Sequence, residues 1–115
     1  MTWPTGKPES VLLALVAKTS SNAVAILDPD DVILWVNKSY TALTGWSSDE
    51  VIGRHPWEFL NGPDTDPEAI RELASACADG RPCFVTLINY HKDGHPFWMR
   101  VEKEPVFDAQ GKLAY

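Results

Sequence analysis

Long apolar runs, cysteine and positive charge are all scarce in this 115-residue chain. No apolar run approaches the roughly 20 residues that a membrane-spanning helix requires. The 10 Lys and Arg residues are outnumbered by 16 Asp and Glu residues, which gives a formal net charge of −6. Binding to nucleic-acid phosphates needs clustered basic residues, so this charge argues against a nucleic-acid partner. The N-terminus also lacks a basic stretch followed by a long apolar segment. We therefore expect no signal peptide, no direct membrane contact and a cytoplasmic location.

Residues with the chemistry of catalytic or metal sites are few and poorly spaced. Cys77 and Cys83 form no Cys-X-X-Cys pair, so we interpret both as reduced, small hydrophobic residues. His91 and His95 lie on either side of a predicted turn, and we expect exposed turn residues rather than metal ligands. The chain has neither a phosphate-binding Gly-rich loop followed by Lys and Ser or Thr, nor a Gly-X-Ser-X-Gly elbow. We expect no catalytic residues, no metal site and no enzyme activity.

Hydrophobic residues make up 44% of the chain, which is enough for one domain with one core. The patterns predict a flexible leader over 1–8, an amphipathic helix over 9–20 and a mixed helix-and-strand domain over 21–115. The apolar face of the N-terminal helix consists of Val11, Leu12, Leu15 and Val16.

The order of elements within the mixed domain indicates an α+β fold. The expected strands cover 23–27, 32–36, 83–90 and 96–107, and a fifth begins at 113. The expected helical segments are 38–43, a turn capped by Ser47, a turn over 56–60 and a helix from Asp66 to Gly80. Asp93-Gly94 between the long strands is a strong hairpin signal, since glycine adopts positive φ without a Cβ clash. We predict a five-stranded antiparallel sheet, one face of which is covered by the short helices, with a ligand pocket between sheet and helices.

Five segments follow one another along the chain: residues 32–37, residues 44–46, Gly53-Arg54, residues 59–63 and the hairpin of residues 86–98. Their order and spacing resemble the PAS family of sensory domains and, within it, the flavin-binding LOV branch. The resemblance covers roughly residues 20–115. It implies the PAS fold for the mixed domain.

The segment that carries the photoactive cysteine in LOV domains differs here. That family pattern is Gly-Arg-Asn-Cys-Arg-Phe-Leu-Gln-Gly-Pro, and its cysteine adds covalently to the illuminated flavin. Residues 53–63 contain one extra residue and place Pro56 or Trp57 at the cysteine position. We therefore expect no cysteinyl-adduct photochemistry. One hypothesis is that Trp57 fills the space of a flavin ring and leaves a smaller pocket.

The polar groups that hold flavin in LOV domains are only partly kept. The resemblance aligns the two phosphate-binding arginines with Glu58 and Ala74. The ring-contacting glutamine aligns with Asn61. One ring-binding asparagine is kept as Asn89, and another is replaced by Met99. A phosphate next to Glu58 loses charge-assisted bonds and gains repulsion, which argues against FMN held in the LOV manner.

The resemblance implies a sensory domain of a larger bacterial signalling protein, either a histidine kinase of a two-component system or a cyclic-di-GMP enzyme. A small-ligand or redox signal would pass from the pocket to a covalently linked output domain. The cofactor is left open: flavin is one candidate. Haem is disfavoured, since its only candidate ligand, His55, precedes a proline at a helix start and fits a capping role. The residues expected to line the pocket are Ile26, Trp57, Leu60, Asn61, Leu73, Leu87, Asn89, Trp98 and Met99.

Two alternatives stay open at this point. The domain could be a ligand-free dimerisation scaffold that uses the N-terminal helix and the outer sheet face. It could also be a flavin (FAD or FMN) redox sensor without the cysteine reaction. We expect a homodimer in either case.

Overall fold

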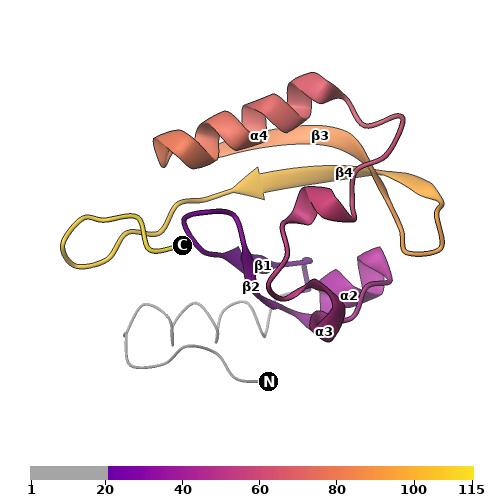
Figure 1. Ribbon diagram of the computed structural model, residues 1–115, viewed down its shortest axis with the longest axis horizontal. Helices are drawn as coiled ribbons and strands as arrows, with labels where there is room; N and C mark the ends of the chain where they lie inside the picture. The colour runs from indigo at the N-terminus through magenta and orange to yellow at the C-terminus, as the bar shows by residue number, and fades with distance from the viewer. Residues whose placement is uncertain (1–20) are drawn as a thin grey trace.

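The computed structural model describes residues 21–115, and Figure 1 shows the order of elements. The predicted leader and N-terminal helix fall outside these residues. The strands are β1 (Ala25–Leu27), β2 (Ile33–Val36), β3 (Cys83–Tyr90) and β4 (Pro96–Lys103). The helical segments are α2 (Lys38–Thr44), α3 (Ser48–Val51), the 3-10 turn η1 (Pro56–Glu58) and α4 (Pro67–Asp79). Within the described range, every helix is too short or too polar to cross a bilayer.

Local capping signals set the helix boundaries where the sequence predicts them. The Asp66 side chain accepts a hydrogen bond from the backbone N–H of Glu68 at 3.0 Å, and α4 ends at Gly80, which has a φ of 62°. Ser47 and Glu50 form the predicted capping box at the start of α3. These contacts satisfy backbone groups that would otherwise be unpaired at the helix ends.

The strands pair as two separate antiparallel sheets, β1 with β2 and β3 with β4. The predicted single sheet of five strands is therefore not formed by residues 21–115. In place of a fifth strand, the end of the chain folds back on itself through an isolated bridge between Phe107 and Leu113. The backbone N–H groups of Ala114 and Tyr115 both donate to the carbonyl oxygen of Val106. The polar groups that a fifth strand would offer to the sheet are thus bonded within this terminal loop.

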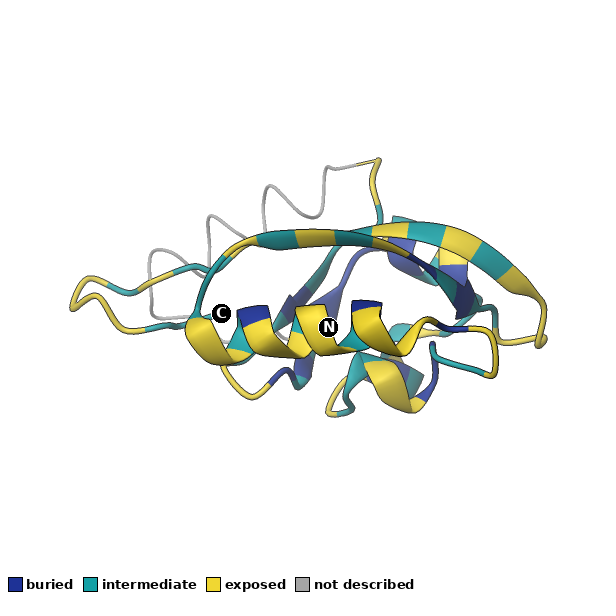
Figure 2. Cartoon of the chain, turned by 90° about the horizontal axis from the view of Figure 1, so that it is seen from above, coloured by how far each residue is buried: buried dark blue, intermediate teal, exposed yellow. Residues whose placement is uncertain are grey.

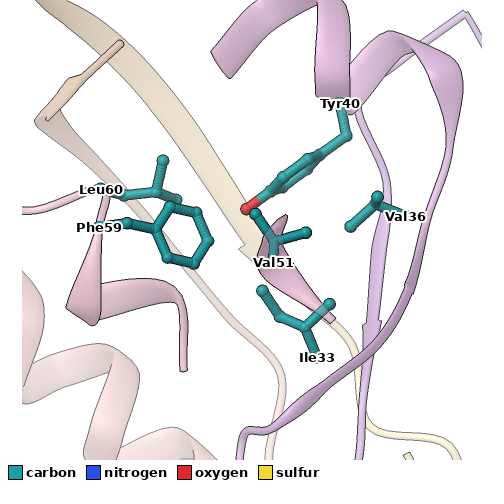
Figure 3. Close-up of a cluster of buried hydrophobic side chains, with 6 residues drawn as sticks. All are labelled: Ile33, Val36, Tyr40, Val51, Phe59 and Leu60. Atoms are coloured by element: carbon teal, nitrogen blue, oxygen red, sulfur yellow. The ribbon is translucent and has the colours of Figure 1, made fainter. Parts of the chain in front are cut away.

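The main core lies between β2 and the helical segments that follow it. Figure 3 shows its six buried side chains pointing toward one another. They are Ile33, Val36, Tyr40, Val51, Phe59 and Leu60. Backbone bonds join β2 to the end of α3: Ile33 N–H donates to the Arg54 carbonyl at 2.9 Å, and Gly53 N–H donates to the Ile33 carbonyl at 2.8 Å. This core holds the middle helices in place.

Helix α4 and the β3–β4 hairpin form a second layered unit. Helix α4 packs along β3 in the views of Figures 1 and 2. Exposure alternates along both strands, as the changing colours of Figure 2 show, because successive side chains of a strand point to opposite faces. Leu87 and Asn89 of β3 are buried, whereas Phe84 of β3 and Trp98 of β4 are exposed. One face of the hairpin therefore looks inward and the other faces solvent.

Candidate functional site

A cavity of about 380 Å³ lies against the inner face of the β3–β4 hairpin. Its volume falls within the roughly 300–1,000 Å³ that small-molecule pockets occupy. Helix α4 contributes Ile70, Leu73 and Ala74, the η1 segment contributes Pro56, Trp57, Leu60 and Asn61, and α2 contributes Tyr40. The hairpin contributes Leu87, Asn89, Met99, Arg100, Val101, Glu102 and Lys103, and the β1–β2 region contributes Ala23, Ala25, Leu27 and Asp31. The cavity thus joins both parts of the fold.

Most of the pocket residues predicted from the sequence line this cavity. They are Trp57, Leu60, Asn61, Leu73, Leu87, Asn89 and Met99. Three separate segments of the chain supply them. Binding of a ligand by these residues remains a prediction.

Ile26 and Trp98, which were also predicted to line the pocket, lie elsewhere. Trp98 is 69% exposed on the outer face of the hairpin, while its neighbour Met99 lines the cavity. Ile26 packs against Trp35, away from the cavity. Its two neighbours in β1, Ala25 and Leu27, line the cavity instead. In both strands the cause is the same: adjacent side chains point to opposite faces, so only one of two neighbours reaches the cavity.

Several lining residues were not predicted from the sequence. Ile70 shares the helix face of Leu73, because residues three apart lie on one side of a helix, and this spacing could have identified it. Val101 and Lys103 follow Met99 at strand alternation and could have been found in the same way. No local signal points to Tyr40, which reaches the cavity through the packing of α2.

Two residues that line the cavity each have a buried polar atom that lacks a hydrogen-bond partner in residues 21–115. The two atoms are the Tyr40 hydroxyl and the Asn89 Oδ1. Among residues 21–115, the Asn89 Nδ2 has the Met99 sulfur as its one hydrogen-bond partner, at 3.2 Å, and sulfur is a weak acceptor. Burial raises the pKa of Tyr40, so its hydroxyl stays protonated. Buried polar atoms normally have partners, and these two could bond a ligand or a water molecule.

Charged side chains along the cavity wall are paired with one another. Lys103 Nζ lies 2.8 and 2.9 Å from the two carboxylate oxygens of Asp31. Arg100 Nε lies 3.0 Å from a carboxylate oxygen of Glu102. Both cations already have an anionic partner, so a phosphate entering this cavity would have to compete for them.

The position aligned with a phosphate-binding arginine of LOV domains carries a negative charge. The backbone N–H of His55 donates to Glu58 Oε2 at 2.7 Å, and this bond lowers the pKa of the Glu58 carboxyl. Arg54 lies 3.7 Å from the same carboxylate. At Ala74, the other aligned position, the side chain offers no hydrogen bond. The residues present therefore do not fit the phosphate of a flavin bound in the LOV manner.

Trp57 stands at the edge of the cavity and does not fill it. Its side chain is 46% exposed and stacks on the His55 ring, with centroids 4.3 Å apart and an angle of 9°. The hypothesis that Trp57 occupies the flavin space is therefore wrong for this structure. Cys77 and Cys83 are free, and neither is among the residues that line this cavity.

Comparison with known protein families and sequences gives consistent matches. A family model described as PAS domain matches residues 21–115. Blue-light-activated histidine kinase 1 of Erythrobacter litoralis is 42% identical over 96 residues, which make up 81% of this chain and 26% of that protein. The blue-light-activated histidine kinase of Brucella canis is 41% identical over 87 residues, 76% of this chain and 18% of that protein. The chain thus spans about a quarter or less of these relatives.

Solved structures of LOV domains share this fold. A light-oxygen-voltage domain studied with a flavin analogue matches with a TM-score of 0.82 and 32% identity, over 90% of this chain and 78% of that one. The light-state LOV structure of the blue-light photoreceptor Aureochrome1 matches with a TM-score of 0.76 and 31% identity, over 90% of this chain and 81% of that one. The resemblance found in the sequence is confirmed at the level of fold.

Proposed function

Since this chain belongs to the PAS domain family, we propose that it is the sensory input domain of a larger signalling protein. The blue-light-activated histidine kinases that it resembles support a histidine kinase as the linked output domain. A cyclic-di-GMP enzyme is the alternative output. The domain itself carries no catalytic activity in this proposal, and it acts inside the cell.

The signal in this proposal is a small molecule without a phosphate group, bound in the 380 Å³ cavity. The observation that carries it is that two residues lining the cavity, Tyr40 and Asn89, each have a buried polar atom without a bonding partner in residues 21–115, while the cations of the cavity wall are already paired. A ligand with both a donor and an acceptor would satisfy both atoms. Because Tyr40 belongs to α2 and Asn89 to β3, such a ligand would favour conformations that hold these elements together and shift the population of the domain.

The test is to extract purified 115-residue protein with organic solvent and to identify bound compounds by mass spectrometry. We expect a phosphate-free compound in near-stoichiometric amount, and much less of it after Tyr40→Phe and Asn89→Leu are combined. Thr86→Val, a control on the exposed face of the hairpin, should leave the amount unchanged. Equal recovery from all three proteins would contradict binding by these groups.

A flavin redox sensor that lacks the LOV cysteine reaction is a second candidate. The TM-score of 0.82 to a LOV domain studied with a flavin analogue favours it. An absorption spectrum of freshly purified protein shows whether flavin is bound, because flavin absorbs in the blue, and mass spectrometry of the extract shows whether that flavin carries phosphate. FMN or FAD in the extract would argue against the phosphate-free ligand.

A ligand-free dimerisation module is a third candidate, and the exposed apolar side chains Phe84 and Trp98 on the outer face of the hairpin favour it. In this reading the domain forms a homodimer through that face and the segment 9–20. Sedimentation of the full chain, of a chain without residues 1–20 and of Trp98→Lys would test it. A monomer in all three proteins would exclude the dimer.

A further inference from the structure

The tip of the β3–β4 hairpin gathers His91, Asp93 and His95. The two imidazole rings stack with centroids 4.6 Å apart and an angle of 16°. Asp93 Oδ1 lies 3.2 Å from His91 Nδ1 and is also hydrogen-bonded to His95 Nδ1. One ligand atom from each residue lies within 4.8 Å of the other two. The turn therefore brings together side chains that the sequence suggests are independent and exposed.

Backbone bonds hold this arrangement in place. His91 N–H donates to the His95 carbonyl at 3.0 Å, and Gly94 N–H donates to the His91 carbonyl at 2.8 Å. Asp93 N–H donates to His91 Nδ1 at 3.1 Å, and His95 N–H donates to Asp93 Oδ1 at 3.0 Å. Residues two apart on this turn thus place their side chains on the same side.

The hairpin tip is also fixed to the end of α2. The His91 ring lies over Gly45, where an added Cβ would approach ring atom Cε1 to 2.4 Å. Lys92 N–H donates to the Thr44 carbonyl at 2.9 Å, and Lys92 Nζ forms an ion pair with Glu50. Any group bound at the tip would therefore meet side chains that are already positioned.

We propose that His91, Asp93 and His95 form a binding site for a divalent transition-metal cation such as Zn²⁺. Two imidazole nitrogens and one carboxylate oxygen are a donor set that zinc accepts, with bonds of about 2.0–2.2 Å and a fourth position for water. Tetrahedral zinc ligands with such bonds lie about 3.3 Å apart. To reach that geometry, the two imidazole rings would turn out of their stack, and Asp93 Oδ1, now 2.5 Å from His95 Nδ1, would move away from that nitrogen.

Metal binding would exchange two present hydrogen bonds, that of His95 Nδ1 with Asp93 Oδ1 and that of the Asp93 N–H with His91 Nδ1, for metal–ligand bonds. Neutral imidazoles can coordinate through Nδ1 when the proton resides on Nε2, so no change of net charge is needed at either histidine. Because the unfolded chain does not hold the three groups together, Zn²⁺ would stabilise the folded state. The site is separate from the cavity, and it does not depend on the proposed sensory function.

The test is isothermal titration of Zn²⁺ into metal-stripped 115-residue protein, with Mg²⁺ as the comparison ion. We expect one Zn²⁺ per chain and no binding of Mg²⁺, which prefers an all-oxygen octahedral shell. His95→Ala should weaken Zn²⁺ binding at least about tenfold, since it removes one of three protein ligands. His55→Ala is the matched control, because it removes a histidine outside the hairpin and should change nothing. Combined Cys77→Ser and Cys83→Ser should also leave binding unchanged.

Imidazole nitrogen spectra provide a second measurement that does not depend on substitution. On addition of Zn²⁺ the resonances of His91 and His95 should shift, and those of His55 should not. The proposal is overturned if Zn²⁺ does not bind, if binding survives in His95→Ala, if it is lost with the cysteines, or if Mg²⁺ binds equally well.

Discussion

Replacing Asn89 with leucine should raise the stability of the ligand-free protein. Asn89 is 3% exposed, and its Oδ1 has no partner in the described part of the chain. A buried polar group without a hydrogen bond costs about 1–3 kcal/mol, whereas the amide's contact with the Met99 sulfur contributes little. The leucine side chain can extend into the adjoining cavity. We therefore expect the free energy of unfolding to rise by about 1 kcal/mol, the lower end of that range.

The same substitution at Asn37 should have the opposite sign. Asn37 is 4% exposed, so its burial matches that of Asn89. Its Oδ1 accepts hydrogen bonds from the backbone N–H groups of Val24 at 2.9 Å and Tyr40 at 3.0 Å, and its Nδ2 donates to the Asn22 carbonyl at 2.8 Å. Asn37→Leu removes the N-cap of α2 and leaves these groups without their partner. Stability should fall by about 3 kcal/mol.

Urea unfolding followed by tryptophan fluorescence measures both changes on protein stripped of any bound compound. In a domain of this size, 1 kcal/mol corresponds to roughly 4 °C in Tm, so thermal unfolding provides an independent check. A loss of more than about 1 kcal/mol in Asn89→Leu would refute the reasoning, because an amide whose removal costs that much must already be well bonded. The case for a polar ligand in the cavity would then fail as well.

Two further predictions concern ion pairs that join distant segments. Lys103→Met should lower the free energy of unfolding by about 2 kcal/mol, because it leaves the buried Asp31 carboxylate unpaired. Adding Asp31→Asn should recover most of that loss, and a double-mutant cycle measured by urea unfolding tests this. A loss that Asp31→Asn does not reduce would argue against the pair. Hydrogen bonds from Lys92 and from the Ser47 backbone lower the pKa of Glu50 to about 2. Their stabilising effect should therefore be complete above the ordinary Glu pKa of about 4.5 and should be lost as pH falls toward 2. Thermal unfolding of Glu50→Gln across this pH range should show a weaker acid dependence than wild type, and identical slopes would contradict the assignment.

Features that depend on a few consecutive residues could be predicted from the sequence. The start of α4 at Asp66 and its end at Gly80 follow from an N-cap side chain and from a residue that tolerates positive φ. The capping box of α3 and the hairpin turn at Asp93-Gly94 follow from equally short patterns. Family motifs spread over the chain were enough to predict the PAS fold, which the comparisons confirm.

The inner and outer faces of the hairpin were only partly predictable. Strand alternation requires that Trp98 and Met99 point to opposite sides, yet both are hydrophobic and either could have been the inner one. The packing of α4 on β3 decided that Met99 lines the cavity and Trp98 faces solvent. Local patterns likewise did not reveal that the four strands pair as two separate sheets.

Short patterns in the sequence determined where the α4 helix and the β3–β4 hairpin begin and end, because caps, turns and alternation act over only a few neighbouring residues. Tertiary structure alone placed Tyr40 beside the same cavity as Asn89 and paired Lys103 with Asp31. The positions of these groups result from the packing of whole elements. The cavity and its unbonded polar atoms exist only once helices and strands have been brought together, since no local rule specifies the space left between them.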